Sequence, residues 1–496
     1  MIDQNPLPSR QLRIVAHVTR WILGLVAAFW LLLIAVGVVL HGFIVPRIGE
    51  WRGHVERLAT QVVGAPVEIG AIAARSEGIF PTIELLRLVV LDEKGRKALE
   101  LPRVVATLSA RSVLRLGLEQ LYIDAPVLDV RRLQDGRWQI AGFDLPSHSS
   151  TDPDSPALQW LLDQPELALR QGVVHFTDAL QGLPAQSFEK VDLVVRRHHW
   201  EHTMRLDATP TESPGQHLQA MGVFRLPLLP SSQPQWQRWT GQWYAHTQLH
   251  QLPQLPWPSQ WGITDAQGAG AVRVWADIKR GQLAEVTTDM ALDTANIQWS
   301  QTDTPALELH KLQGRVLVQS DAQGWKVEGR NVSFMQNVTG THWPSSNWAM
   351  EVDTPHSQPQ RSRLTWDYAD VGMASAVAQA LPLPASVLAP LAQLQPRGAL
   401  RDVQLQWTPE HYSAKGRVSD LSVQPQAKDA EVGTPGFQGL TGTFELNEQG
   451  GQAQLAMQDG ALTFPGVFEV PDIALDRLQA QLRWQVKDGH WQLQVP

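Results

Sequence analysis

The sequence predicts a mainly β protein: a transmembrane helix near the N-terminus, then a compact β-rich unit, then an elongated antiparallel sheet. Three observations predict it. Apolar and polar residues alternate with period two through most of the chain after Pro66, which is typical of strands with one buried face. Turn pairs such as Lys94-Gly95 and Asp135-Gly136 separate the alternating segments. The chain contains 20 Trp but only 4 Tyr, and many of the Trp lie in alternating segments, where flat side chains suit a pleated surface.

Composition excludes several functions. A chain of 496 residues can hold two to four ordinary domains or one elongated one. The net charge of -8 and the dispersed Lys and Arg residues argue against a nucleic-acid partner, because phosphate binding needs a basic stripe. With no cysteine, the chain has no disulfide, no thiolate nucleophile and no cysteine-based zinc site.

The first element is an apolar segment, Trp21 to Leu40, which carries no charge. At about 1.5 Å per residue a helix of this length spans roughly 30 Å, the thickness of a bilayer core, so we predict a transmembrane anchor over 21–45. No small-residue cleavage site follows, which favours an uncleaved anchor. Three arginines precede the segment and three follow it, so charge does not set the orientation. The simpler topology has a cytoplasmic tail at 1–20 and exports the remainder.

A second helix and a β-rich unit follow. Apolar residues recur every three or four positions from Ile48 to Val62, which predicts an amphipathic helix ending near Gly64. Alternating segments then predict strands up to residue 144. Ser, Asp and Pro dominate 145–157, which predicts a linker, with a short helix after it at 157–163.

The remainder, 158–496, consists mostly of short predicted strands separated by turns. In one hairpin a loop from Asp321 to Gly324 places Val318 opposite Val327 on one face. Only 371–394 looks helical, and its prolines divide it into short pieces. Helices are therefore too scarce to cover the apolar face. We expect a second sheet, curling of the sheet on itself, or a molecule other than protein to cover it.

The chain ends in a predicted hairpin. Its turn at Asp488-Gly489 places Val486 opposite Trp491, Trp484 opposite Leu493, and Leu482 opposite Val495, so all six share a face with Leu478. The segment 491–495 would form an unpaired edge strand, which proteins normally pair, cover or blunt. We therefore expect more chain, or another protein, to continue the sheet there.

Signals of catalysis are weak. His198, Glu201 and His202 could bind a metal on a helix, but the flanking residues are strand-like and favour a polar hairpin loop. Asp152 and Asp154 lie in the linker and are expected to be solvated. The chain has no Gly-rich phosphate loop after a strand, no G-x-S-x-G and no H-E-x-x-H. We therefore expect no catalytic residues, no metal and no cofactor, and we do not expect an enzyme.

Several stretches resemble a known family. They are "RLATQVVGAPVEIGAIAARSEGIF" with "VLDVRRLQDGRWQIAG" in the first half, and "ALPLPASVLAPLAQLQPRGALRDVQLQW" with "FQGLTGTFELNEQGGQAQLAMQDGALTFPGVF" in the second. In this order they resemble the YhdP-like branch of the AsmA-like proteins of the Gram-negative envelope. The resemblance implies a single-pass inner-membrane protein with 46–496 in the periplasm, a chorein-like unit at 46–144, and a curled sheet over 158–496.

The resemblance also implies a function: a hydrophobic groove in this sheet would conduct phospholipids between the inner and outer membranes. The groove-lining residues would be Val403, Leu405, Trp407, Leu478, Leu482, Trp484, Val486, Trp491, Leu493 and Val495. Relatives are longer, so this chain would need a partner or further chain to bridge the envelope. The alternative is an envelope assembly or scaffold protein with a dry β-core and no lipid transport.

Overall fold

The computed structural model describes residues 10–39, 42, 49–75, 82–91, 95–107, 118–144, 160–161, 163–180, 185–213, 215–225, 239–249, 262–300, 304–321, 323–336, 341–354, 360–428, 431–487 and 490–495. The chain forms two compact units, Met1–Glu212 and Ser213–Pro496. The predicted linker at 145–157 lies outside the described residues. The predicted domain boundaries therefore remain predictions.

The first unit begins with a long helix, α1 (Arg10–Val39), which includes most of the predicted anchor. Its apolar side chains are exposed, for example Trp21 and Leu25. Within the described ranges, no helix has both the length and the apolar character that crossing a membrane requires. The structure therefore does not confirm the predicted transmembrane helix.

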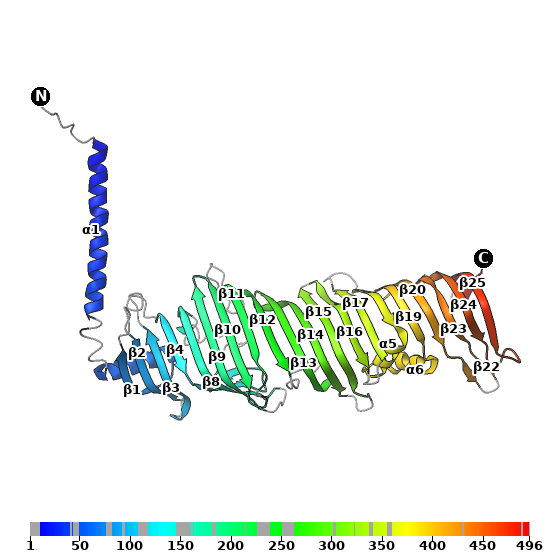
Figure 1. Cartoon of the computed structure of the whole chain (residues 1–496), viewed down its shortest axis with the longest axis horizontal. Coiled ribbons are helices and arrows are strands. Elements are labelled where there is room, and N and C mark those ends of the chain that lie inside the picture. Colours follow the sequence, from blue (N-terminus) through cyan, green and yellow to red (C-terminus); the bar gives the residue numbers. More distant parts are fainter. Residues whose placement is uncertain are drawn as a thin grey trace. The chain divides into compact units, whose positions relative to one another are not determined.

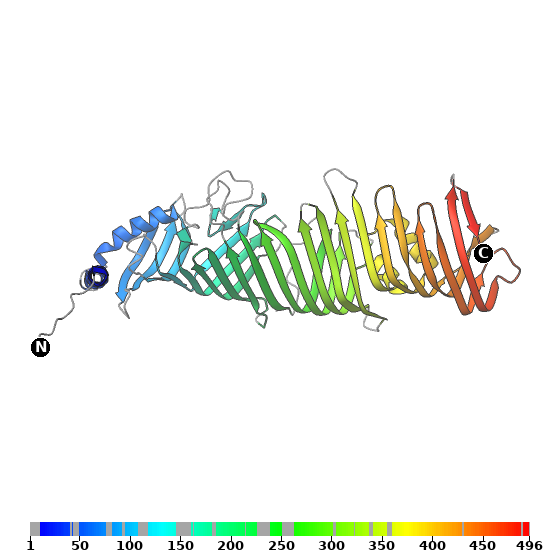
Figure 2. The same cartoon turned by 90° about the horizontal axis from the view of Figure 1, so that it is seen from above.

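The predicted amphipathic helix is confirmed as α2 (Arg52–Val63). It ends where Gly64 takes a left-handed conformation with φ of 74°, which glycine adopts without a Cβ clash. Val55, Ala59 and Val63 pack on the core of the first sheet, and Figure 2 shows α2 lying alongside the first strands. The helix covers this part of the sheet because its apolar residues recur on one side.

The sheet of the first unit is antiparallel except at one strand. It is built from β1 (Val67–Arg75), β2 (Thr82–Leu91), β3 (Lys97–Thr107), β4 (Gln120–Asp124), β5 (Val127–Arg132), β6 (Trp138–Ile140), β7 (Phe143–Asp144), β8 (Glu166–Asp178), β9 (Gln186–His198) and β10 (Glu201–Pro210). Strand β8 runs parallel to both β4 and β5, which differs from the antiparallel order that we predicted. Parallel neighbours need a long crossover, and the connection between β7 and β8 is long enough to provide it.

The second unit is an open antiparallel sheet in which each strand pairs with the next (Figure 1). Its strands are β11 (Leu218–Arg225), β12 (Thr240–Leu249), β13 (Ile263–Lys279), β14 (Gln282–Trp299), β15 (Leu307–Asp321), β16 (Gly324–Gln336), β17 (Thr341–Asp353), β18 (Arg361–Asp370), β19 (Arg397–Trp407), β20 (Tyr412–Val423), β23 (Gly436–Asn447), β24 (Gly450–Thr463), β25 (Asp472–Lys487) and β26 (His490–Gln494). A separate small hairpin joins β21 (Gln426–Lys428) and β22 (Glu431–Thr434).

Two short helices, α5 (Val371–Gln379) and α6 (Ala385–Leu394), connect β18 to β19, as the prolines predicted. Helix α5 begins because the Asp370 carboxylate accepts a hydrogen bond from the Met373 backbone N–H at 2.8 Å. Pro384 precedes α6 and Pro390 lies inside it. Both helices lie beside the ends of β18–β20 in Figure 1.

The predicted hairpin registers are largely confirmed. Val318 pairs with Val327, and at the C-terminus Val486 pairs with Trp491 and Trp484 with Leu493. The turn at 488–489 lies outside the described residues. The described ladder ends at the pair Arg483 and Gln494, so the predicted pairing of Leu482 with Val495 remains a prediction.

Candidate functional site

One face of the second sheet carries an unbroken row of apolar residues, which we call the inner row. It takes one residue from every strand of the sheet, each paired with the next across the ladder. Its members are Gly222, Trp243, Ala276, Val286, Val318, Val327, Met350, Leu364, Leu405, Ala414, Leu446, Gly451, Trp484 and Leu493. We call the face that carries this row the inner face. A charged residue does not occur anywhere in the row.

The neighbouring positions, which point to the opposite face, form the outer row: Met221, Tyr244, Trp275, Thr287, Leu317, Glu328, Ala349, Thr365, Gln404, Lys415, Glu445, Gln452, Arg483 and Gln494. From β16 onward most of this row is polar. Ion pairs stabilise the charges, since the ammonium of Lys326 and the guanidinium of Arg330 each lie 2.6 Å from the Glu328 carboxylate and hold its pKa below the usual range. From β16 onward, the two faces therefore differ sharply in chemistry.

The predicted groove residues that the structure describes lie on the inner face. Leu405, Trp484 and Leu493 belong to the inner row. The others stand an even number of residues from Leu405 or Trp484 on the same strand and therefore share the inner face: Val403 and Trp407 in β19, and Leu478, Leu482 and Val486 in β25. The backbone of Trp491 pairs with Val486, and its side chain lies outside what the structure describes. The exposure of the groove residues differs: Val403 is 8% exposed and Leu493 63%. Val495 is exposed beyond the last described pair.

Aromatic side chains on the inner face lie against cross-strand glycines, a feature that sequence reasoning missed. The pairs are Phe224 with Gly241, Trp243 with Gly222, Trp348 with Gly329, Phe444 with Gly416, and Trp484 with Gly451. A Cβ built on Gly329 would lie 2.3 Å from Nε1 of the Trp348 indole, and one on Gly451 would lie 2.4 Å from the Trp484 ring. Each ring therefore occupies the space that a side chain at the opposite glycine would fill, so the ring lies against the sheet and the face remains apolar.

A line of bulges crosses the strands. Lys311, Asn331, Asp402, Asp420 and Asp459 all have φ near +50°, a conformation that Asn and Asp tolerate better than most residues. At each bulge the apolar alternation skips one residue. For example, Gly329 and Val332 are three apart in β16, yet they pair with Trp348 and Ser346, which are two apart in β17. The skip keeps apolar residues on the inner face along the whole strand.

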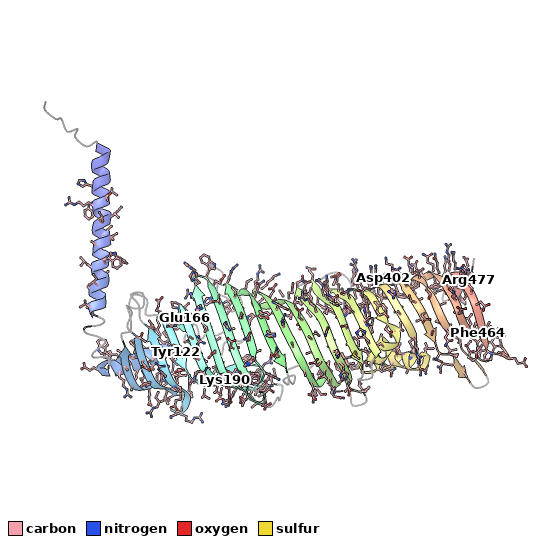
Figure 3. All side chains as sticks on the ribbon, in the orientation of Figure 1. Tyr122, Glu166, Lys190, Asp402, Phe464 and Arg477 are labelled. Atoms are coloured by element: carbon pink, nitrogen blue, oxygen red, sulfur yellow. The ribbon has the colours of Figure 1, made fainter. Side chains whose placement is uncertain are left out.

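Side chains from neighbouring strands satisfy the backbone at this line. Asn347 Oδ1 accepts a hydrogen bond from the Asn331 N–H at 2.9 Å, and Asp367 Oδ1 accepts one from the Asn347 N–H at 2.8 Å. Figure 3 labels Asp402 on β19, where the Arg417 guanidinium pairs with its carboxylate. Isolated Asn and Asp residues that interrupt the alternation were the sequence signal for these bulges.

Helix α5 covers one part of the inner face. Met373, which is 3% exposed, packs with Trp343 and Ala369 in the core of the second unit. Beyond the helix end, the Ala380 carbonyl accepts a hydrogen bond from the Trp299 indole N–H at 2.7 Å. The helix thus packs on residues of β17–β19, and the residue that follows it reaches the end of β14.

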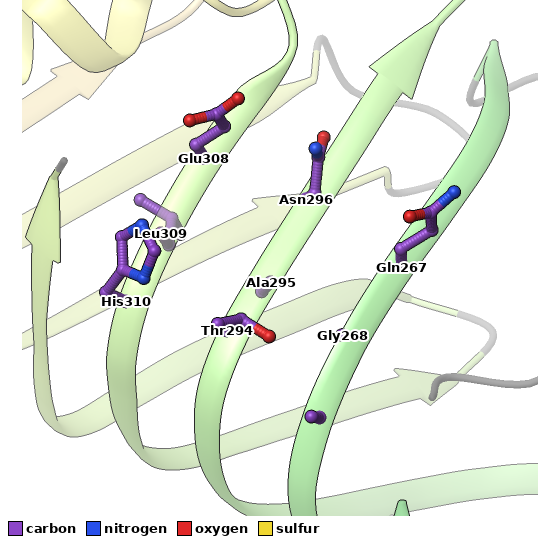
Figure 4. A pocket seen from close by; sticks show the side chains of 9 residues that line it. Gln267, Gly268, Thr294, Ala295, Asn296, Glu308, Leu309 and His310 are labelled. Carbon is purple, nitrogen blue, oxygen red and sulfur yellow. The ribbon is translucent and has the colours of Figure 1, made fainter. Parts of the chain in front are cut away.

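Two cavities lie among the described residues of the second unit. The smaller, about 290 Å³, is lined partly by polar side chains such as Gln267, Asn296 and Glu308, which are paired across β13–β15 (Figure 4). The strands bend along their length here. The larger, about 450 Å³, lies at the edge of the sheet where β17 ends, β18 begins and a turn joins β19 to β20. Neither cavity has the apolar lining that the resemblance implied for the groove.

The His-rich segment forms the β9–β10 hairpin, in which His198 pairs with Glu201 across the turn. This is the polar hairpin that the sequence favoured over a helical metal site. Among the described residues, no group of three or more His, Asp or Glu side chains is placed to hold a metal.

Comparison with known proteins gives one match. The family model described as "YhdP protein" matches residues 7–496, nearly the whole chain. No curated protein matches significantly. No solved structure matches significantly either. The ordered segments that suggested this family are thus supported by a match along the chain, and the chain belongs to the YhdP family of bacterial envelope proteins.

Proposed function

We propose that this protein binds phospholipid acyl chains on the inner face and conducts them between the inner and outer membranes. The observation that supports this most directly is the inner row, which crosses every strand of the second sheet without a charge. An acyl chain has no hydrogen-bonding groups, so it loses nothing against such a surface and gains about 0.8 kcal/mol for each methylene that leaves water.

The row is longer than a lipid. At about 4.8 Å per strand it runs on the order of 60 Å, several times the width of one acyl chain. Several lipids can therefore lie side by side across the strands. Because the inner row offers no polar anchor, an acyl chain has similar contacts at each position. Transport is then sliding, with no chemical step.

In this proposal, 21–45 anchors the chain in the inner membrane and 46–496 lies in the periplasm. Its support is the ring of exposed apolar side chains on α1 and the absence of charge from Trp21 to Val39. Exposed apolar residues on every side of a helix are typical of contact with lipid. The anchor is tested by expressing the chain with and without residues 1–45 and measuring how much of each form stays in the membrane fraction.

The acyl-binding proposal is tested with a matched pair of valines. Val318 lies in the inner row and is 39% exposed, whereas Val223 lies on the outer face and is 40% exposed. Val318→Glu places a charge where acyl chains would lie, and Val223→Glu places the same charge on the opposite face. Phospholipid retained by the purified full chain is counted by mass spectrometry.

We expect Val318→Glu to lose most of the bound phospholipid and Val223→Glu to keep it, with similar thermal unfolding for both. Equal retention by the two variants would contradict the proposal. So would a wild-type protein that carries no phospholipid, which would favour the scaffold with a dry core.

A further inference from the structure

The smaller cavity lies on the outer face of β13–β15. Gly268, Ala295 and Leu309 pair with one another and belong to the inner face. Since side chains alternate along a strand, the residues on either side of these three point to the outer face. They form two cross-strand rows that line the cavity, one of Gln267, Asn296 and Glu308 and one of Ala269, Thr294 and His310 (Figure 4). The cavity is therefore on the opposite side of the sheet from the apolar inner row.

The hollow forms over short side chains. Ala269 and Thr294 extend little from the sheet, whereas the side chains of Gln267, Glu308 and His310 around them are long. The strands also bend along their length here. The volume of about 290 Å³ is at the lower end of the range for small-molecule sites, so the hollow suits a single ring-sized group.

The polar groups around the hollow are available to a ligand. Within the described part of the chain, the side chains of Asn296, Glu308 and His310 form no hydrogen bond or ion pair. Gln267 Nε2 donates a hydrogen bond to Asp265 Oδ2 at 2.8 Å, which leaves Gln267 Oε1 as an acceptor. Asn296 and His310 are half-buried, so their polar atoms lie within the hollow and not at the tips of extended side chains.

Other acidic residues of the outer face are held by their neighbours. Gln319 Nε2 donates a hydrogen bond to the Glu285 carboxylate at 2.8 Å, and the Arg315 guanidinium donates one to Asp289 at 2.8 Å. Among the described residues, Glu308 has no such donor. A group of unpaired polar side chains thus surrounds one hollow, on strands whose ladder holds them in place.

The mixture of donors and acceptors indicates the ligand class. A carboxylate only accepts hydrogen bonds, an imidazole can donate one, and an amide does both. A ligand hydroxyl also does both, so neighbouring hydroxyl groups can satisfy Glu308 and Asn296 together. An apolar ligand would leave these polar groups without partners, which costs free energy.

Charge excludes two further classes. The lining contains no Lys or Arg, and the carboxylate of Glu308 repels an anion. Among the residues that the structure describes, no set of three His, Asp or Glu side chains is placed to hold a metal cation. A neutral ligand rich in hydroxyl groups fits the lining best.

We propose that this cavity binds one ring of a neutral saccharide. Ring hydroxyls donate to the Glu308 carboxylate and accept from Asn296 and His310, while the ring lies over Ala269. The site faces away from the inner row, so this inference goes beyond the proposed function and does not depend on it. The protein then contacts carbohydrate with its outer face while its inner face carries lipid.

The test uses the full chain in a detergent without a sugar headgroup. Binding of two neutral saccharides, maltotetraose and chitotetraose, is titrated by saturation-transfer NMR, which detects weak binding through the ligand signals. We expect at least one of them to bind. Asn296→Ala and Glu308→Ala should each weaken this binding roughly threefold to tenfold, because each removes about one hydrogen bond in a partly exposed site. Calcium chloride or inorganic phosphate should not displace the saccharide.

Gln404→Ala is the matched control, because Gln404 is an exposed amide of the outer row in β19 and lies outside the cavity. It should bind the saccharide as the wild type does, and all three variants should unfold thermally as the wild type does. The saccharide site is wrong if neither saccharide binds, if Asn296→Ala and Glu308→Ala match Gln404→Ala, or if either ion displaces the saccharide.

Phospholipid retention separates this inference from the proposed function. Asn296→Ala and Glu308→Ala should retain phospholipid as the wild type does, because both residues lie on the outer face. If these variants lose saccharide binding while Val318→Glu keeps its phospholipid, the proposed function fails and the saccharide site stands.

Discussion

The contact between Gly329 and Trp348 gives a prediction whose magnitude follows from the structure. A methyl group on Gly329 would lie 2.3 Å from the indole Nε1 and 2.4 Å from Cε2 of Trp348, and real Cβ atoms do not approach other heavy atoms so closely. The indole ring is rigid, so Gly329→Ala must push the whole ring or separate β16 from β17. Overpacking of this kind costs about 1–3 kcal/mol.

Hydrogen exchange of peptides covering 324–353 measures this cost locally, which matters in a chain that divides into two units. A loss of about 1–3 kcal/mol speeds exchange from the opened state roughly fivefold to 150-fold. Combining Gly329→Ala with Trp348→Leu should recover part of the loss, because the ring that causes the overlap is gone.

The matched control is Gly372→Ala in α5, where the nearest atom to a new Cβ is the Asp370 carboxylate oxygen at 3.5 Å. This substitution should be neutral, or should stabilise the helix by up to about 1 kcal/mol. If both alanine variants leave exchange unchanged, the aromatic rings do not lie against glycines as the structure has them, and the reasoning about the inner face is refuted.

Three further predictions concern other parts of the fold. Asn331→Gly should be nearly neutral in urea unfolding, whereas Asn331→Val should destabilise by about 1–2 kcal/mol, because φ is +52° there. The pKa of the Glu56 carboxyl is held below its usual value, mainly by the hydrogen bond from the Ile69 N–H and then by the guanidinium of Arg52. The ionised carboxylate should therefore stabilise the α2–β1 contact fully above about pH 4.3, the pKa of Glu56 in the unfolded chain, and this stabilisation should fall as the pH drops through the lower pKa of the folded state. Glu56→Gln should remove this pH dependence in thermal unfolding. Trp299→Phe removes the hydrogen bond to Ala380, so exchange in α5 should rise several-fold while β16 is unchanged.

Local periodicity was enough to predict the strands and much of their pairing. Val318 opposite Val327 and Trp484 opposite Leu493 both follow from alternation and a short turn, because side chains alternate strictly along a strand. The same rule could not place β8 beside β4 and β5. That parallel pairing joins segments more than thirty residues apart, and no local pattern encodes which strand a later segment chooses.

The candidate site was predictable to the same extent. Leu405 and Trp407 alternate with glutamines, and the two-residue period of a strand is enough to put them on one face. The contacts between aromatic rings and cross-strand glycines were not predictable, because alternation fixes the face of a residue but not its partner across the ladder.

The bulge line explains how an apolar face can continue along strands that bend. In β15, Leu309 and Leu312 are three residues apart, which in a regular strand would put them on opposite faces. Their partners in β14, Ala295 and Leu292, pair in turn with Gly268 and Gly270 of β13, which are two apart and share a face. Lys311, with φ of 48°, absorbs the extra residue. Without it, one half of β15 would turn its polar side to the inner face, so the chemistry proposed for that face depends on residues that point away from it.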